Sequence, residues 1–134
     1  MGKIIKTSAL SLALAVLLVS PAFAAVDTAC MITAVEKRDN AVITAWDTFS
    51  TTYKTALETR RDALKTAWAD TNRNTRKASI RNAWKAFRNS KKSAWRTRKA
   101  SIRSAWRQFK SERQTCGATA ADESGTQAID TSVE

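Results

Sequence analysis

Apolar residues in the middle of the chain recur at a helical spacing with an eleven-residue period. Ala-Trp or Ala-Leu pairs begin at residues 45, 56 and 67, and again at residues 83, 94 and 105. Eleven residues make close to three turns of an α-helix, so successive pairs return to nearly the same side. The chain has neither proline nor glycine between residues 28 and 115, and both would destabilise a helix interior. The pattern predicts long, nearly straight amphipathic helices.

The period breaks once, between Trp68 and Trp84, which are sixteen residues apart. In one continuous helix this step would rotate the apolar stripe by about 160°, to the opposite side. The interval also contains Asp and Asn residues, which favour turns over helix interiors. We therefore predict two helices, over roughly 28–70 and 75–115, joined by a turn at 71–74.

Two cysteines, Cys30 and Cys116, lie at nearly equal distances from this break. Antiparallel helices of similar length would bring them together at the open end, which favours a disulfide between them over two unrelated thiols or an intermolecular bond. Such bonds persist in oxidising compartments. The predicted fold is all-α: a long antiparallel two-helix hairpin, coiled-coil-like, with an eleven-residue repeat.

Residues 1–24 have the form of a secretory signal peptide. Two lysines precede an apolar run at 9–19, and a small-x-small sequence ends at Ala24, as signal peptidase requires. The run is shorter than the ~20 residues that span a membrane, so cleavage is favoured over an uncleaved anchor. We expect a mature chain that begins at Ala25 and is exported to the periplasm, the cell envelope or the medium.

The C-terminal residues differ in composition from the predicted hairpin, which we place at 25–117. Residues 118–134 are small and polar, with four acids and no basic residue. A segment of this kind cannot bury enough apolar surface to fold. We therefore predict a disordered acidic tail, which follows a glycine, Gly117, at the expected helix C-cap.

Charge is distributed unevenly between the two predicted helices. Residues 26–70 carry six basic and seven acidic side chains, whereas residues 71–113 carry fifteen basic side chains and one acid. The second helix is therefore a cationic rod, and the first lacks the acids to neutralise it. Because so large a charge repels itself, an anionic partner is a better explanation than a merely solvated surface.

We predict an exported, non-enzymatic protein that binds an anionic polymer through its second helix. The polymer could be nucleic acid, an acidic glycan or a phosphate-rich polymer of the envelope. Basic side chains would clamp its phosphates or carboxylates without reading a sequence. The candidate anion-binding residues are Arg76, Lys77, Arg81, Lys85, Arg88, Lys91, Lys92, Arg96, Arg98, Lys99, Arg103, Arg107 and Lys110.

The aromatic residues on the apolar stripes are expected to form mainly the seam between the helices, with the alanines beside them. A two-helix hairpin cannot bury a wide stripe on both members, so some aromatic surface should remain for a third helix, a second copy of the chain or a lipid surface. The tryptophans assigned to core or interface are Trp46, Trp68, Trp84, Trp95 and Trp106.

Two other functions stay open on the sequence alone. Basic amphipathic helices with tryptophan at the boundary bind anionic membrane surfaces, and the eleven- and twenty-two-residue period resembles that of apolipoprotein helices. Those repeats mix acidic and basic residues and often contain proline, and residues 75–115 have neither feature. The third possibility is a structural or assembly hairpin of the cell envelope, including a homo-oligomer.

The sequence contains no constellation that would support catalysis. Histidine is absent, which removes the commonest general base and metal ligand. Two cysteines make no zinc site, and no glycine-rich phosphate loop, nucleophile elbow or calcium loop occurs. We therefore predict no catalytic residue, no metal and no cofactor.

Overall fold

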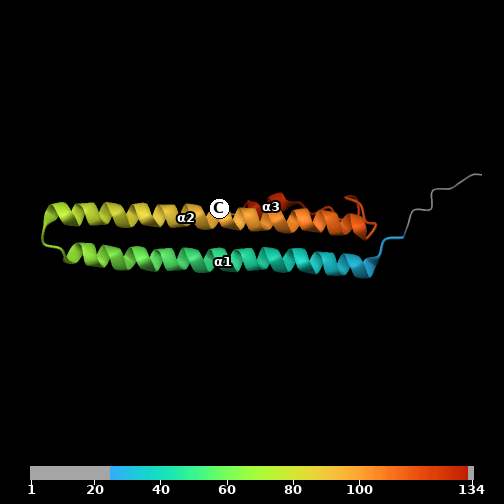
Figure 1. Ribbon diagram of the computed structural model, residues 1–134, viewed down its shortest axis with the longest axis horizontal. Helices are drawn as coiled ribbons and strands as arrows, with labels where there is room; N and C mark the ends of the chain where they lie inside the picture. Colours follow the sequence, from blue (N-terminus) through green and yellow to red (C-terminus); the bar gives the residue numbers. More distant parts are fainter. Residues whose placement is uncertain (1–24, 133–134) are drawn as a thin grey trace, which may run out of the picture.

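The computed structural model describes residues 25–132, so the predicted signal peptide lies outside the described residues. Helix α1 spans Thr28–Ala69 and helix α2 spans Arg73–Thr115. The two helices run antiparallel and side by side as a long rod (Figure 1). A short helix, α3, spans Gln127–Thr131. The described chain is mostly helical and contains no strand, and its two long helices form the predicted hairpin.

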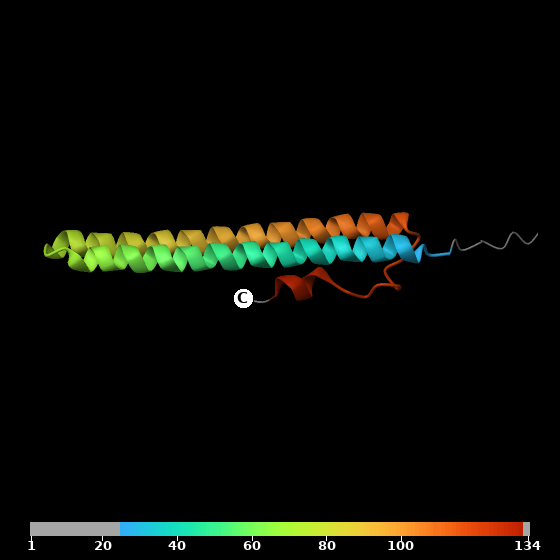
Figure 2. The same ribbon diagram turned by 90° about the horizontal axis from the view of Figure 1, so that it is seen from below.

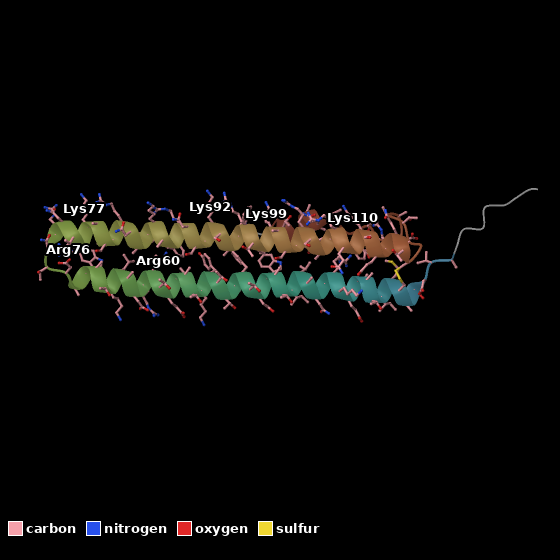
Figure 3. All side chains as sticks on the ribbon, viewed as in Figure 1. Arg60, Arg76, Lys77, Lys92, Lys99 and Lys110 are labelled. Atoms are coloured by element: carbon pink, nitrogen blue, oxygen red, sulfur yellow. A yellow bond between two sulfur atoms is a disulfide. The ribbon has the colours of Figure 1, made fainter. Side chains whose placement is uncertain are left out.

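The predicted disulfide between Cys30 and Cys116 is present and joins the helices at the open end of the rod (Figure 3). The two Cα atoms are 5.5 Å apart. Asp27 strengthens the same end, because its backbone N–H donates to the carbonyl of Cys116 at 3.0 Å and its carboxylate accepts from the N–H of Cys30 at 2.9 Å. Gly117 follows α2 with a φ of +76°, the left-handed conformation that glycine adopts at helix ends.

The turn at the other end is shorter than the predicted 71–74. The side chain of Asn72 caps α2 by accepting from the N–H groups of Asn74 and Thr75, at 2.9 and 3.4 Å. Asn74 therefore belongs to the first turn of α2 rather than to the loop. Asp70 accepts from the Thr75 hydroxyl and from the backbone of Asn72, and these bonds hold the pKa of Asp70 below its usual range.

Alanines line the seam between the helices, where the sequence analysis expected mainly aromatic rings. All six alanines of the eleven-residue period are buried: Ala45, Ala56, Ala67, Ala83, Ala94 and Ala105. Among the aromatics, Trp106 and Phe109 are buried as expected, but Trp84 is 41% exposed and Trp68 is 66% exposed. A methyl group lets two helices approach closely, and this closeness displaces the larger rings toward one side of the seam.

Enlarging one seam alanine should therefore destabilise the hairpin. We expect Ala105→Leu to lower the free energy of unfolding by about 1–3 kcal/mol, because Ala105 is packed within the core and the added carbons must push the helices apart. Ala100→Leu is the matched control, since Ala100 is exposed on the same helix. Urea unfolding followed by circular dichroism measures both variants. Equal stability of the two would contradict an alanine seam.

The C-terminal residues take a defined path where the sequence predicts disorder. After α2 the chain turns back and runs along one face of the hairpin, and α3 lies beside the half of the rod that contains the open end (Figure 2). The indole Nε1 of Trp106 donates to Asp130 at 2.6 Å, and Arg38 lies 3.8 Å from a carboxylate oxygen of Glu123. Composition alone did not indicate these contacts, because they depend on residues brought together by the hairpin.

Candidate functional site

The sequences of α1 and α2 are related by an offset of 38 residues. Arginine, phenylalanine and the Ala-Trp pairs all recur at this spacing. The identical pairs include Arg38 and Arg76, Ala45 and Ala83, Trp46 and Trp84, Phe49 and Phe87, Ala56 and Ala94, Arg60 and Arg98, Ala67 and Ala105, and Trp68 and Trp106. Because the helices run antiparallel, the repeat gives the hairpin an approximate internal twofold symmetry.

Ten cations of α2 occupy positions that form a straight line along the helix. The steps between successive cations are four, four and three residues, repeated along the helix. Each set of three steps covers eleven residues, or about three helical turns, so the cations stay on one side of the helix. We name this set the cationic ladder: Lys77, Arg81, Lys85, Arg88, Lys92, Arg96, Lys99, Arg103, Arg107 and Lys110. All are exposed except Lys99, which is half-buried.

The cationic ladder faces away from α1. Lys77, Lys92, Lys99 and Lys110 all project from the outer side of α2 (Figure 3). At 1.5 Å per residue the ladder extends for about 50 Å, with one positive charge every ~5.5 Å. Among residues 25–132 no carboxylate forms an ion pair with a ladder residue. The one acid of α2, Glu112, pairs instead with Lys37 of α1 at 3.1 Å.

The corresponding line on α1 has no such charge. Thirty-eight residues before nine of the ladder positions, α1 carries three acids, three bases and three uncharged residues: Asp39, Ile43, Asp47, Ser50, Lys54, Glu58, Arg61, Lys65 and Ala69. The eight residue pairs given above are identical in the two helices, whereas among these nine outer positions only Lys54 has an identical counterpart, Lys92. Packing of the hairpin therefore does not require the cations of α2, and α1 remains helical and exposed without them.

A second group of arginines lies across the seam, with each guanidinium over an aromatic ring of the opposite helix. These arginines all occupy one position of the repeat, and the tryptophans that they contact all occupy another. We name each such contact an Arg–Trp clamp. The clamps are Arg38 with Trp106 and Phe109, Arg60 with Trp84 and Phe87, Arg98 with Trp46 and Phe49, and Arg76 with Trp68. The guanidinium carbon lies 4.0–4.6 Å from the ring centroids in the first three and 5.5 Å in the fourth.

The clamps change the assignment of two predicted anion-binding residues. Arg98 is 2% exposed, and burial lowers the pKa of its guanidinium. Arg76 is half-buried and donates to the carbonyl of Asp70 at 3.0 Å. Both side chains therefore contribute to the seam rather than to the outer surface. Of the remaining predicted residues, the ten in the ladder lie together, and Lys91 is exposed beside them.

Sequence reasoning missed Arg38 and Arg60, although a signal for them exists. An arginine stands eight residues before the tryptophan of an Ala-Trp pair at four places in the chain. Cation–π contacts of this kind contribute about 0.5–2 kcal/mol each, more when water is excluded. The recurrence therefore marks a structural role for these arginines, distinct from that of the ladder.

A groove connects the ladder to the aromatic side of the seam. It has a volume of about 780 Å³ and lies beside the clamp of Arg98. Four aromatic rings and four cations line it: Trp46, Phe49, Tyr53, Trp95, Arg88, Lys91, Lys92 and Arg98. Arg88 and Lys92 belong to the ladder, so a ligand held by the ladder could also place a ring or an apolar group against these aromatics.

Comparison of the chain with protein-family models, with curated proteins and with solved structures finds no match. None of the helices in residues 25–132 has the length and apolarity that crossing a membrane requires. The same residues contain no cluster of histidine, cysteine or acidic side chains that could hold a metal ion.

Proposed function

We propose that the mature protein is exported and binds an anionic polymer along the cationic ladder of α2. Nucleic acid, an acidic glycan and a phosphate-rich envelope polymer all present the required line of negative charge. The role is one of binding rather than catalysis. The disulfide supports the export part of the proposal, because such bonds persist in oxidising compartments.

One observation carries this proposal: the ladder is uniformly cationic while the equivalent line on α1 is balanced. A surface that served only solubility would need no straight line of ten like charges, and their mutual repulsion opposes folding. A linear polyanion relieves this repulsion by lying along the ladder and releasing its own counterions. The straightness of the ladder suits an extended polymer better than a small anion.

Binding should depend steeply on salt. With six to ten phosphates of duplex DNA engaged, affinity should fall by about 10³-fold or more between about 50 mM and about 200 mM salt. Fluorescence anisotropy with labelled duplexes of unrelated sequence measures this dependence, and the affinities should agree because backbone contacts carry no sequence information. A sulfated or uronic-acid glycan provides the second polymer. A protein that binds no polyanion at low salt would contradict the proposal.

The exposed Trp68 and Trp84 near the turn favour one alternative, a hairpin that lies on an anionic membrane surface. Vesicles of anionic and of neutral lipid, added to the same assay, distinguish it. Membrane binding should quench or shift tryptophan fluorescence and should persist in part at high salt, because the aromatic rings insert. Polyanion binding without vesicle binding supports the ladder proposal.

A further inference from the structure

The clamp nearest the open end of the hairpin is occupied by the chain's own acidic tail. Trp106 donates its indole N–H to Asp130 at 2.6 Å, and the guanidinium of Arg38 lies 3.8 Å from Glu123. Trp106 is consequently only 5% exposed. This clamp, formed by Arg38, Trp106 and Phe109, therefore shows which chemistry fits it: a peptide segment that brings carboxylates to an indole N–H and a guanidinium.

The same clamp is repeated about 33 Å closer to the turn, because Arg60, Trp84 and Phe87 lie 22 residues away on each helix. Its geometry is the same: the guanidinium of Arg60 lies 4.4 Å from the Trp84 ring and 4.3 Å from the Phe87 ring. In the occupied clamp the corresponding distances are 4.6 and 4.3 Å. We name this second copy the turn-side clamp.

The turn-side clamp lacks the cover that the tail gives to the first. Trp84 is 41% exposed, and within residues 25–132 no acceptor takes a hydrogen bond from its indole N–H. Through residue 132, the last that the structure describes, the tail lies along the open-end half of the rod (Figure 2). A neighbouring groove of about 630 Å³ is lined by three cations, Leu64 and Trp68. One of those cations, Arg61, pairs with Asp62 at 2.8 Å.

We propose that the turn-side clamp is a docking site for an acidic peptide segment of a partner protein. A carboxylate of the segment would accept the hydrogen bond from Trp84 and pair with Arg60, as Asp130 and Glu123 do at the first clamp. Charge argues for this partner over a second copy of the hairpin. Pairing two turn-side faces would bring the arginines and lysines of both copies together.

The probe is a synthetic peptide of residues 118–134, labelled for fluorescence anisotropy and titrated into the full oxidised chain of residues 25–134. We expect one peptide bound per chain. Trp84→Phe removes the indole donor, and Arg60→Gln removes the charge. Each should weaken binding about tenfold to a hundredfold, the effect of losing a hydrogen bond to a charged group. Arg96→Gln is the matched control, with the same loss of charge on the exposed ladder twelve residues, or about 18 Å, from Trp84, and should change binding less than about twofold.

A second variant tests how many peptide-binding sites each chain has. Replacing Glu123 by Gln and Asp130 by Asn in the full chain should release the tail from the first clamp, so that two peptides bind per chain instead of one. Equal losses in Arg60→Gln and Arg96→Gln, or tight binding of a scrambled peptide, would show general attraction to a basic protein and overturn the proposal. Self-association in sedimentation that is abolished by Trp84→Phe would also overturn it, by showing that a second copy occupies the face.

Discussion

Reduction of the Cys30–Cys116 disulfide should lower the free energy of unfolding of the hairpin by about 4–5 kcal/mol. The bond joins residues that are 86 positions apart, and closing so long a loop removes much of the entropy of the unfolded chain. The two-helix rod depends on this bond because its core is thin. Among residues 25–132 the two fully buried large side chains, Ile102 and Phe109, both lie on α2 toward the bridged end.

Urea unfolding with and without a reducing agent, followed by circular dichroism, measures the contribution of the disulfide. The chain has no other cysteine, so the reductant acts on one bond. A variant with serine at both positions should show the reduced stability and no response to the reductant. A loss below about 1 kcal/mol would mean that the helices hold each other without the bridge, contrary to the entropy argument.

Trp106→Ala should lower the free energy of unfolding by about 3–5 kcal/mol, the usual effect of removing a buried tryptophan. The ring packs against Phe109 with centroids 5.7 Å apart, stacks under Arg38 and bonds to Asp130. Trp68→Ala removes the same atoms from a site that is 66% exposed. We expect that change to cost less than about 1 kcal/mol.

Trp84 lies between these two cases, because it is 41% exposed and carries the clamp of Arg60. Trp84→Ala should therefore destabilise the hairpin less than Trp106→Ala and more than Trp68→Ala. Denaturant midpoints of the three variants, measured under the same oxidising conditions, give this order. Three equal losses would contradict a seam that buries tryptophan only at its open end.

The helices and the turn could be predicted because they depend on local sequence. The eleven-residue period, the single phase break and the two cysteines each point to the same hairpin. The arrangement within the seam could not be read from the period. Alanine and tryptophan are neighbours in each pair and share one stripe, so the period does not say which of the two faces the other helix. That choice depends on how closely the helices approach, which is a property of the folded pair.

The candidate site was predicted in its overall position but not in its detail. Counting basic residues identified α2, and ten of the thirteen assigned residues lie in the ladder. The count also included Arg98, whose burial depends on Trp46 and Phe49 of the other helix. The position of the tail also depends on contacts that form only in the folded chain. Its composition indicates disorder, whereas its position depends on Trp106 and Arg38, residues that the fold brings together.

The 38-residue correspondence between α1 and α2 offers a direct test of whether the cationic ladder binds the polymer. Lys92, Lys99 and Arg103 of the ladder correspond, 38 residues earlier, to three cations of α1, which are Lys54, Arg61 and Lys65. Replacing either set by glutamine removes three positive charges, so the two variants have the same net charge. They differ only in the helix that loses the cations.

The decisive measurement is the slope of log affinity against log salt for duplex DNA, or for whichever polyanion binds in the first assay. Each phosphate contact on duplex DNA contributes about 0.9 to this slope. We expect the ladder variant to lose two to three units of slope, at about 0.9 per removed contact, while the α1 variant keeps the slope of the parent chain. Equal losses in the two variants would show that net charge, rather than the ladder, holds the polymer, and would contradict the proposed function.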